Sequence, residues 1–155
     1  MPFYQFSHLQ KVPTDKATLW DFISSPANLS IITPAELDFK ILSKNLPAKM
    51  YPGMLIHYHV RPLFGIKINW VTEITQVDIG NYFVDEQRLG PYAMWHHQHF
   101  ITEIDGGMLM EDIVSYIPPL GFLGSIANTL IVKNELKKIF EFREKAVDKH
   151  FGKMG

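Results

Sequence analysis

Residues 93–117 read AMWHHQHFITEIDGGMLMEDIVSYI, two alternating runs separated by Asp105-Gly106-Gly107. Alternation of apolar and polar side chains with a period of two is typical of β-strands with one buried face. Aspartate and glycine tolerate the backbone conformations of a tight hairpin turn. The stretch is therefore predicted to form an antiparallel hairpin, with strands at about 93–104 and 108–117.

The same period of two continues on the N-terminal side of this hairpin. Further strands are predicted at about 3–10, 37–44, 54–60, 66–78 and 81–88. Between most strands after Leu37 the connections are short, as at Gly80-Asn81, and strands joined so closely are antiparallel neighbours. We predict a seven-stranded antiparallel sheet.

Helical periodicity replaces this pattern in two places. Two short helices are predicted after the first strand, one carrying Leu19 to Ile23 and one beginning at Pro26, where a missing N–H costs nothing. Residues 122–151 are predicted to form one long helix, with an apolar stripe that includes Val132, Leu136, Phe140, Val147 and Phe151. Arg143 interrupts this stripe.

Strands and helices are segregated along the chain, which indicates an α+β layer fold. One long amphipathic helix covers a sheet of this length only if the sheet curls around it, and a curled sheet with one helix tends to leave a hollow. We therefore predict a single domain over residues 1–155 in the helix-grip arrangement.

Composition narrows the classes of function. The 155 residues carry a net charge of -1 and no basic stripe, so no nucleic-acid partner is expected. Cysteine is absent, which excludes disulfides and thiolate chemistry and fits a cytoplasmic location. No apolar run approaches the ~20 residues of a membrane span, so no transmembrane segment is expected. A monomer or a homodimer is expected.

Three motifs stand in the second half of the chain: Phe83-x-Asp85-x-Gln87-x-x-Gly90-Pro91-Tyr92, Trp95-x-His97-x-His99 and Asp112-x-Val114-x-Tyr116-x-x-Pro119. They resemble bacterial members of the SRPBCC superfamily, which includes START-domain, Bet v 1-like and polyketide cyclase/dehydrase-like proteins. The resemblance covers nearly the whole chain and implies the Bet v 1-like fold. It leaves the function open, because the superfamily includes lipid carriers, hormone receptors, cyclases and hydroxylase subunits. The missing cysteines exclude the Rieske centre of the hydroxylase branch.

The hairpin also predicts which side chains share a face. If Gly106-Gly107 is a two-residue turn, Ile101 lies opposite Asp112 and His99 opposite Val114. The resulting face mixes large apolar groups with a few hydrogen-bonding ones, as ligand pockets do. We predict that it points inward and that the ligand contacts are Trp70, Trp95, His97, His99, Val114 and Tyr116.

The histidines permit other interpretations. His97 and His99 are equally well explained as core histidines bonded to Asp85, Asp112 or Tyr116. A second His-x-His pair, His57 and His59, suggests metal chelation, but the meander separates the two pairs. We predict no metal site and no cofactor.

Three classes of function remain open. The first is a binding protein for a small, largely hydrophobic molecule such as a lipid, isoprenoid, aromatic or polyketide-like compound. The second is a metal-independent enzyme of cyclase, dehydratase or isomerase type. His97 or His99 would be its general base, and Asp112, Asp85 or Tyr116 would orient the base or donate a proton. The third is a structural or regulatory module with a vestigial cavity.

The meander also predicts an entrance. Alternate connections lie at the same end of an antiparallel sheet, so residues 61–65, 89–92 and 117–121 cluster. The side chains of this cluster are more apolar than is usual in loops, and exposed apolar groups gathered in one place mark interaction surfaces. We predict that the entrance is formed by Leu63, Phe64, Tyr92, Leu120 and Phe122, and that it makes transient contact with a membrane or a protein. The alternative is that these side chains plug the end of the sheet.

Overall fold

The computed structural model describes residues 2–62, 65–119, 126 and 131–155. Strands and helices follow one another in the expected order, with one further short 3-10 helix, η2. Their bounds are β1 Tyr4–Val12, α1 Lys16–Ile23, η1 Pro26–Asn28, η2 Ala35–Leu37, β2 Lys40–Ile41, β3 Leu55–Val60, β4 Ile68–Asp78, β5 Tyr82–Leu89, β6 Met94–Ile104, β7 Gly107–Ile117 and α3 Lys133–Phe151.

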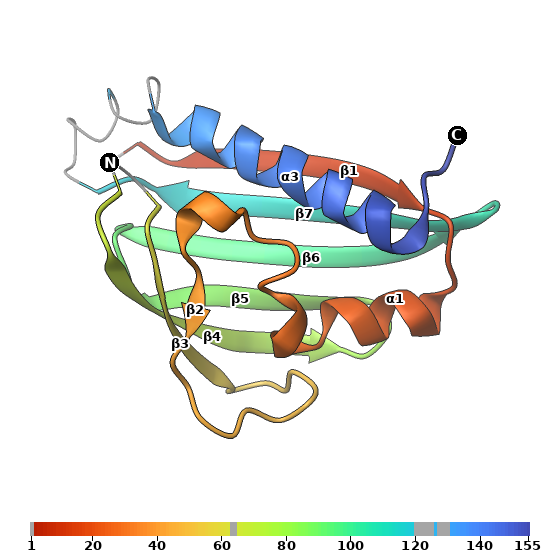
Figure 1. Ribbon diagram of the computed structural model, residues 1–155, viewed down its shortest axis with the longest axis horizontal. Helices are drawn as coiled ribbons and strands as arrows, with labels where there is room; N and C mark the ends of the chain where they lie inside the picture. The colour runs from red at the N-terminus through yellow and green to blue at the C-terminus, as the bar shows by residue number, and fades with distance from the viewer. Residues whose placement is uncertain (1, 63–64, 120–125, 127–130) are drawn as a thin grey trace.

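The seven strands form one sheet in the order β1-β7-β6-β5-β4-β3-β2, and all neighbours are antiparallel. The sheet curves, and α1 and α3 lie on the same face of it (Figure 1). The first strand pairs with the last, so β1 forms one edge beside α3. The predicted seven-stranded α+β helix-grip fold is confirmed.

The hairpin of β6 and β7 differs from the prediction by one position in its turn and by two in its register. Ile104 pairs with Gly107, so the turn is Asp105-Gly106, and Gly106 takes a positive φ of 81°. His97 therefore lies opposite Val114 and His99 opposite Asp112. The predicted register was wrong, but a shift of two keeps every side chain on its face because side chains alternate with a period of two.

Gly107 is required by close packing at this turn. A Cβ atom there would lie 2.2 Å from the carbonyl oxygen of Val12. We expect Gly107→Ala to lower the free energy of unfolding by about 1–3 kcal/mol, because the two backbones must separate. Urea denaturation measures the change. Gly155→Ala is the control, since a Cβ there meets nothing within 4 Å; equal stability of the two variants would contradict this packing.

The C-terminal helix packs through the predicted stripe. Leu136, Phe140 and Val147 of α3 are buried, and the first two pack with Val114 and Tyr116 of β7. The predicted helix began at residue 122, and residues 120–125 and 127–130 lie outside the described residues. Among the described helices, none combines the length and the apolar character needed to cross a membrane.

The predicted strand at 37–44 was largely wrong. Residues 35–37 form the 3-10 helix η2, and Asp38 follows with a positive φ of 47°. The strand pairing with β3 is limited to Lys40 and Ile41, after which the N–H groups of Leu42 and Ser43 both donate to the carbonyl of His57. The segment thus leaves the sheet and turns Leu37 inward, where it packs with Val60 and Trp70.

Candidate functional site

A cavity of about 210 Å³ lies between the curved sheet, the segment at 23–39 and α3. Its wall is mainly apolar and includes Ile23, Ile32, Leu37, Ile74, Leu136 and Ile139. Polar side chains enter the wall in two places, one on β5 and β6 beside α3 and one on β3 and β4. A mostly apolar cavity with a few converging polar groups is the usual form of a small-molecule site.

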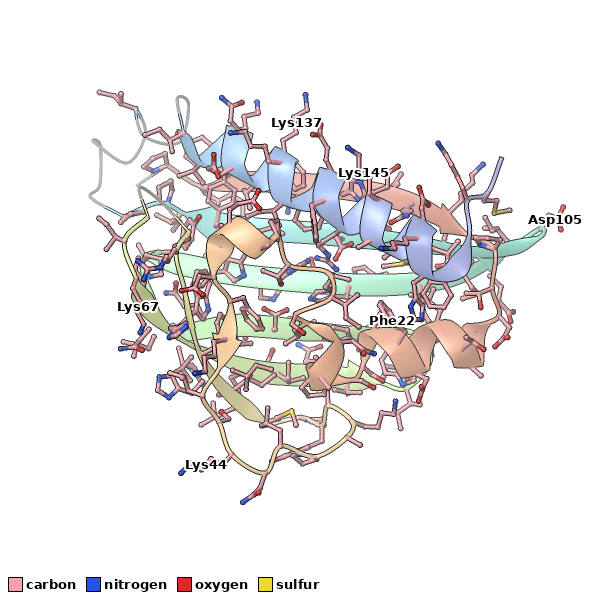
Figure 2. The ribbon with its side chains drawn as sticks, in the orientation of Figure 1. Phe22, Lys44, Lys67, Asp105, Lys137 and Lys145 are labelled. Carbon is pink, nitrogen blue, oxygen red and sulfur yellow. The ribbon has the colours of Figure 1, made fainter. Side chains whose placement is uncertain are left out.

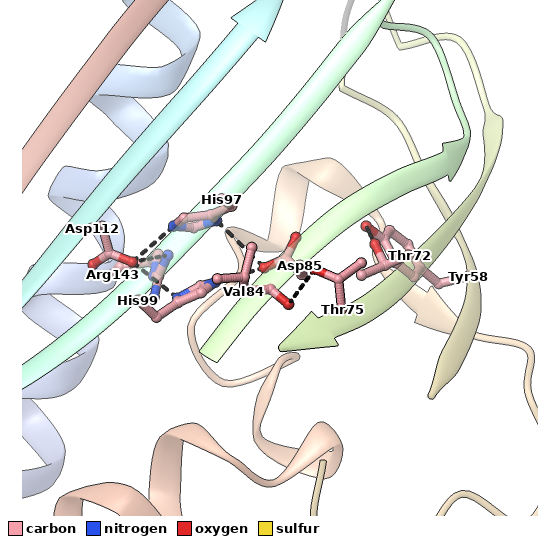
Figure 3. Close-up of polar contacts among 9 residues, drawn as sticks. All are labelled: Tyr58, Thr72, Thr75, Val84, Asp85, His97, His99, Asp112 and Arg143. Carbon is pink, nitrogen blue, oxygen red and sulfur yellow. Dashed lines mark hydrogen bonds and ion pairs between the residues drawn. The ribbon is translucent and has the colours of Figure 1, made fainter. Parts of the chain in front are cut away.

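The first polar group is a network of five charged or titratable side chains (Figure 3). Asp85 comes from β5, His97 and His99 from β6, Asp112 from β7 and Arg143 from α3. Alternation along the strands puts the first four on the inner face. Arg143 reaches them because it occupies the inward stripe of the helix.

Within this network the carboxylates accept hydrogen bonds from the imidazoles. Nε2 of His97 donates to Oδ1 of Asp112 at 2.8 Å. His99 bridges both acids, with Nε2 at 2.6 Å from Oδ2 of Asp85 and Nδ1 at 3.1 Å from Oδ1 of Asp112. Nη1 of Arg143 lies 3.6 Å from the same Asp112 oxygen, an ion pair without a hydrogen bond.

Burial and neighbouring charges set the protonation of the acids. Burial opposes ionisation of Asp112, but the Arg143 charge and the hydrogen bonds from His97 and His99 hold its pKa well below the ordinary value. Burial acts in the same sense on Asp85, and the hydrogen bond from His99 with the nearby positive charges lowers its pKa. Both acids are therefore ionised at neutral pH.

The two histidines respond in opposite directions. Burial, followed by the charge of His99, lowers the pKa of His97 despite its bond to Asp112. Burial also acts to lower the pKa of His99, but its bonds to Asp112 and Asp85 outweigh burial and raise it. Two carboxylates need two N–H donors, which only the imidazolium form of His99 supplies. His99 is thus the charged ring and His97 the neutral one.

These directions predict a stability maximum near pH ~6.5, the ordinary pKa of histidine. The raised pKa of His99 contributes stability below that pH, which is lost as the pH rises through the folded pKa. The lowered pKa of His97 costs stability as the pH falls below ~6.5, because the unfolded chain binds the proton first. Urea denaturation across the pH range measures the curve, and NMR titration of the two rings tests its origin. A His99 ring that loses its proton at a lower pH than His97 would contradict the assignment.

The network also contains the residue types of a metal site. Donor atoms of Asp85, His97 and His99 lie within 4.8 Å of one another. However, the two rings stack with centroids 3.7 Å apart and planes 29° from parallel. Nε2 of His97 and Nδ1 of His99 are both directed at one carboxylate oxygen, Oδ1 of Asp112, at 2.8 and 3.1 Å. The geometry is that of a hydrogen-bonded charge network, and the expected lack of a metal stays a prediction.

The second polar group lies across the cavity on β3 and β4. The hydroxyl groups of Tyr58 and Thr72 form a hydrogen bond of 3.1 Å (Figure 3). Burial raises the pKa of Tyr58, so its hydroxyl stays protonated. Nε1 of the adjacent Trp70 is fully buried and has no hydrogen-bond partner among the described residues. An unpaired buried donor costs about 1–3 kcal/mol, which a ligand acceptor or a water molecule that reaches it would recover.

Gln87 and Gly90 hold Tyr92 in the cavity wall. The Gln87 amide donates to the Tyr92 carbonyl at 2.8 Å and accepts from the Tyr92 N–H at 3.0 Å. A Cβ atom on residue 90 would lie 2.4 Å from Oε1 of Gln87. Glycine is therefore needed for Gln87 to fold over the turn, which explains the Gln87-x-x-Gly90-Pro91-Tyr92 spacing.

The structure divides the predicted ligand contacts into two groups. Trp70, Trp95, His97 and His99 line the cavity. Val114 and Tyr116 lie on the same inner face but pack under α3 with Val132, Leu136 and Phe140, so they fall outside the lining. Of the catalytic candidates, His97, His99, Asp85 and Asp112 form one network, whereas Tyr116 stacks on Tyr4 away from it.

The predicted entrance is only partly described. Tyr92 lies in the cavity wall and packs against Trp70, Trp95 and Tyr116. Leu63, Phe64, Leu120 and Phe122 lie outside the described residues. The entrance therefore stays a prediction.

The second histidine pair lies elsewhere. His57 and His59 are on β3, where Ile56, Tyr58 and Val60 supply the inward side chains. They therefore occupy the outer face of the sheet and do not join the network.

Solved structures of other proteins superimpose on nearly the whole of this chain. Protein Ms6760 from Mycobacterium smegmatis superimposes with a TM-score of 0.67 at 16% identity, over 94% of this chain and 89% of that one. Ara h 8.0201 gives 0.65 at 15% identity, over 97% and 98%. Ginseng major latex-like protein 151 from Panax ginseng gives 0.70 at 10% identity, over 96% and 97%.

The chain has the Bet v 1-like helix-grip fold. No protein-family model and no curated protein matches the sequence. At these low identities the likeness establishes the fold alone.

The sequence interpretation missed Arg143, Tyr58 and Thr72 as parts of the wall. A signal for Arg143 was present, because an arginine inside the apolar stripe of an amphipathic helix needs a buried partner. Tyr58 and Thr72 gave only the ordinary alternation of a strand.

Proposed function

We propose that the protein binds a small, largely apolar molecule in the cavity between the sheet and α3. The observation that supports this proposal is the cavity itself, about 210 Å³ with a mainly apolar wall and two separate polar contacts. For comparison, an apolar cavity of about 150 Å³ is large enough to bind benzene. The size suits an aromatic ring with a short chain better than a long lipid.

Native mass spectrometry of the purified protein tests this proposal. We expect an additional mass of a small organic molecule that disappears on denaturation. If the cavity is emptied during purification, arylalkyl compounds added to the protein should restore such a complex. A protein that carries no extra mass and binds no arylalkyl compound would contradict the proposal and favour a vestigial cavity.

One observation supports a second function, an enzyme of cyclase, dehydratase or isomerase type. Nε2 of His97 is held by the buried Asp112, while Nδ1 of His97 makes no hydrogen bond with a described residue and lies 3.8 Å from Oδ2 of Asp85. A neutral imidazole oriented by a carboxylate on one side and open on the other is suited to general-base catalysis. Once the ligand is known, chromatography with mass spectrometry distinguishes an enzyme from a carrier, because only an enzyme releases an altered molecule. His97→Gln should abolish that turnover and leave binding in place.

A further inference from the structure

Arg143 is placed differently from the other basic residues of α3. Its side chain is 12% exposed and lines the cavity, with the guanidinium carbon 4.8 Å from the centroid of the Phe140 ring. Lys137 and Lys145 point away from the sheet on the outer side of the helix (Figure 2). The helix therefore presents one cation to the cavity and the others to solvent.

The hydrogen-bond donors of Arg143 are unused within the described part of the chain. A guanidinium has five N–H donors in a planar fork. Arg143 donates no hydrogen bond to any described residue, and its contact with Asp112 is 3.6 Å long. Trp70 Nε1 is the fully buried, unpaired polar side-chain atom of the described residues. The nitrogen atoms of Arg143 are therefore not sealed off, and the residue lines the cavity.

The acids of the network leave no place for a cationic ligand. Asp85 is compensated by His99, and Oδ1 of Asp112 already faces His97, His99 and Arg143. With His99 protonated and His97 neutral, two carboxylates balance one imidazolium and one guanidinium. An anionic ligand could accept hydrogen bonds from the unpaired guanidinium donors of Arg143. A cationic ligand would meet only carboxylates that already have a positively charged partner.

We propose that Arg143 binds the carboxylate of an organic acid whose apolar body fills the cavity. This inference rests on the proposed binding function and adds to it the class of ligand. The planar fork of arginine matches a carboxylate in two parallel hydrogen bonds.

Binding of such an acid is coupled to a proton. The carboxylate adds one negative charge to a balanced, buried network. The groups that face His97 are Asp85 on β5, His99 on β6, Asp112 on β7, and Arg143 with the Phe140 ring on α3. The open Nδ1 of His97, near Asp85, is positioned to take up the proton. Affinity for the acid therefore rises as the pH falls toward the pKa of His97 in the free protein, which burial holds below its ordinary value.

Calorimetry with three compounds of the same carbon skeleton tests this inference. The compounds are phenylbutyrate, phenylbutanol and phenylbutylamine. For the wild-type protein near neutral pH we expect the acid to bind about tenfold more tightly than the alcohol, with the amine weakest. Measured in buffers of different ionisation enthalpy, binding of the acid should take up about one proton and binding of the alcohol none.

Two variants assign the effect to Arg143. Arg143→Gln should reduce the preference for the acid to about twofold or less and keep binding of the alcohol, which shows that the cavity is intact. Lys145→Gln removes the same charge from the outer side of α3 and should leave the preference unchanged. If Arg143→Gln does not fold, the inference is tested on the wild-type protein alone, by its preference for the acid over the alcohol and by its proton uptake on binding the acid.

Each contrary outcome has a distinct meaning. Equal affinity of the wild-type protein for acid and alcohol overturns the carboxylate inference and leaves the binding function standing. Tightest binding of the amine also overturns it. Failure of all three compounds to bind contradicts both the inference and the proposed function.

Discussion

Replacing Asp112 by asparagine should lower the free energy of unfolding by about 3–5 kcal/mol, the usual cost of removing one partner from a buried ionic network. Asp112 is 4% exposed and receives hydrogen bonds from His97 and His99 beside the Arg143 guanidinium. Without its charge, the His99 imidazolium and Arg143 are left with one buried carboxylate between them. Urea denaturation near neutral pH measures the loss.

Glu111→Gln is the matched control for Asp112→Asn. Glu111 is the preceding residue on β7 and points to the opposite face, beside the exposed Leu9. Its neutralisation should change stability by less than about 0.5 kcal/mol. Similar small effects of the two substitutions would show that the network contributes little to folding.

Filling the cavity should weaken ligand binding more than any other single change. Ile139 lies on α3, is partly buried and lines the cavity. Ile139→Trp places an indole in the space that a ligand would occupy, and we expect the affinity for phenylbutanol to fall about hundredfold, or about 2.7 kcal/mol. A neutral compound is used so that the result does not depend on Arg143.

Phe142→Trp provides the control for this substitution. Phe142 is on the same helix, is 37% exposed and does not line the cavity. Its replacement should leave affinity unchanged. Thermal unfolding of both variants shows whether the larger side chain at residue 139 fits, since overpacking costs about 1–3 kcal/mol. Unchanged affinity in a well-folded Ile139→Trp variant would place the ligand outside the cavity.

The fold was predictable because apolar side chains recur along the chain with two clear periods, that of a strand and that of a helix. The period of two in β6 and β7 identified Trp95, His97 and His99 as neighbours on one face, although the predicted register was wrong by two residues. That error was harmless, since faces depend on whether a position is odd or even and register depends on the turn. The positive φ of Gly106 decided the turn, and the sequence Asp105-Gly106-Gly107 permits either glycine to occupy it.

The cavity was less predictable, because it depends on where the helix lies on the sheet. Val114 and Tyr116 face inward as expected, yet α3 covers them, and the space opens farther along the sheet toward Trp70 and Ile74. The turn at Asp38 places Leu37 and Phe39 in the wall where a longer strand was predicted. Neither the position of α3 nor that turn leaves a periodic signal in the sequence.

The role of Arg143 was partly predictable. Its conflict with the apolar stripe was visible in the sequence, and a buried arginine requires a buried acid. The identity of that acid, Asp112, depended on the packing of α3 against β7. Sequence alone could therefore indicate that a charged site existed beneath the helix without indicating which residues formed it.

A crystal structure of the protein with bound phenylbutyrate tests the central claim most directly. We expect the phenyl ring inside the cavity between Trp70 and Phe140, and the carboxylate within about 3 Å of the Arg143 guanidinium. A ligand in the cavity with its carboxylate elsewhere would retain the binding function and reject the role of Arg143. An empty cavity with phenylbutyrate absent or bound only at the surface would contradict the claim that this cavity is the ligand site.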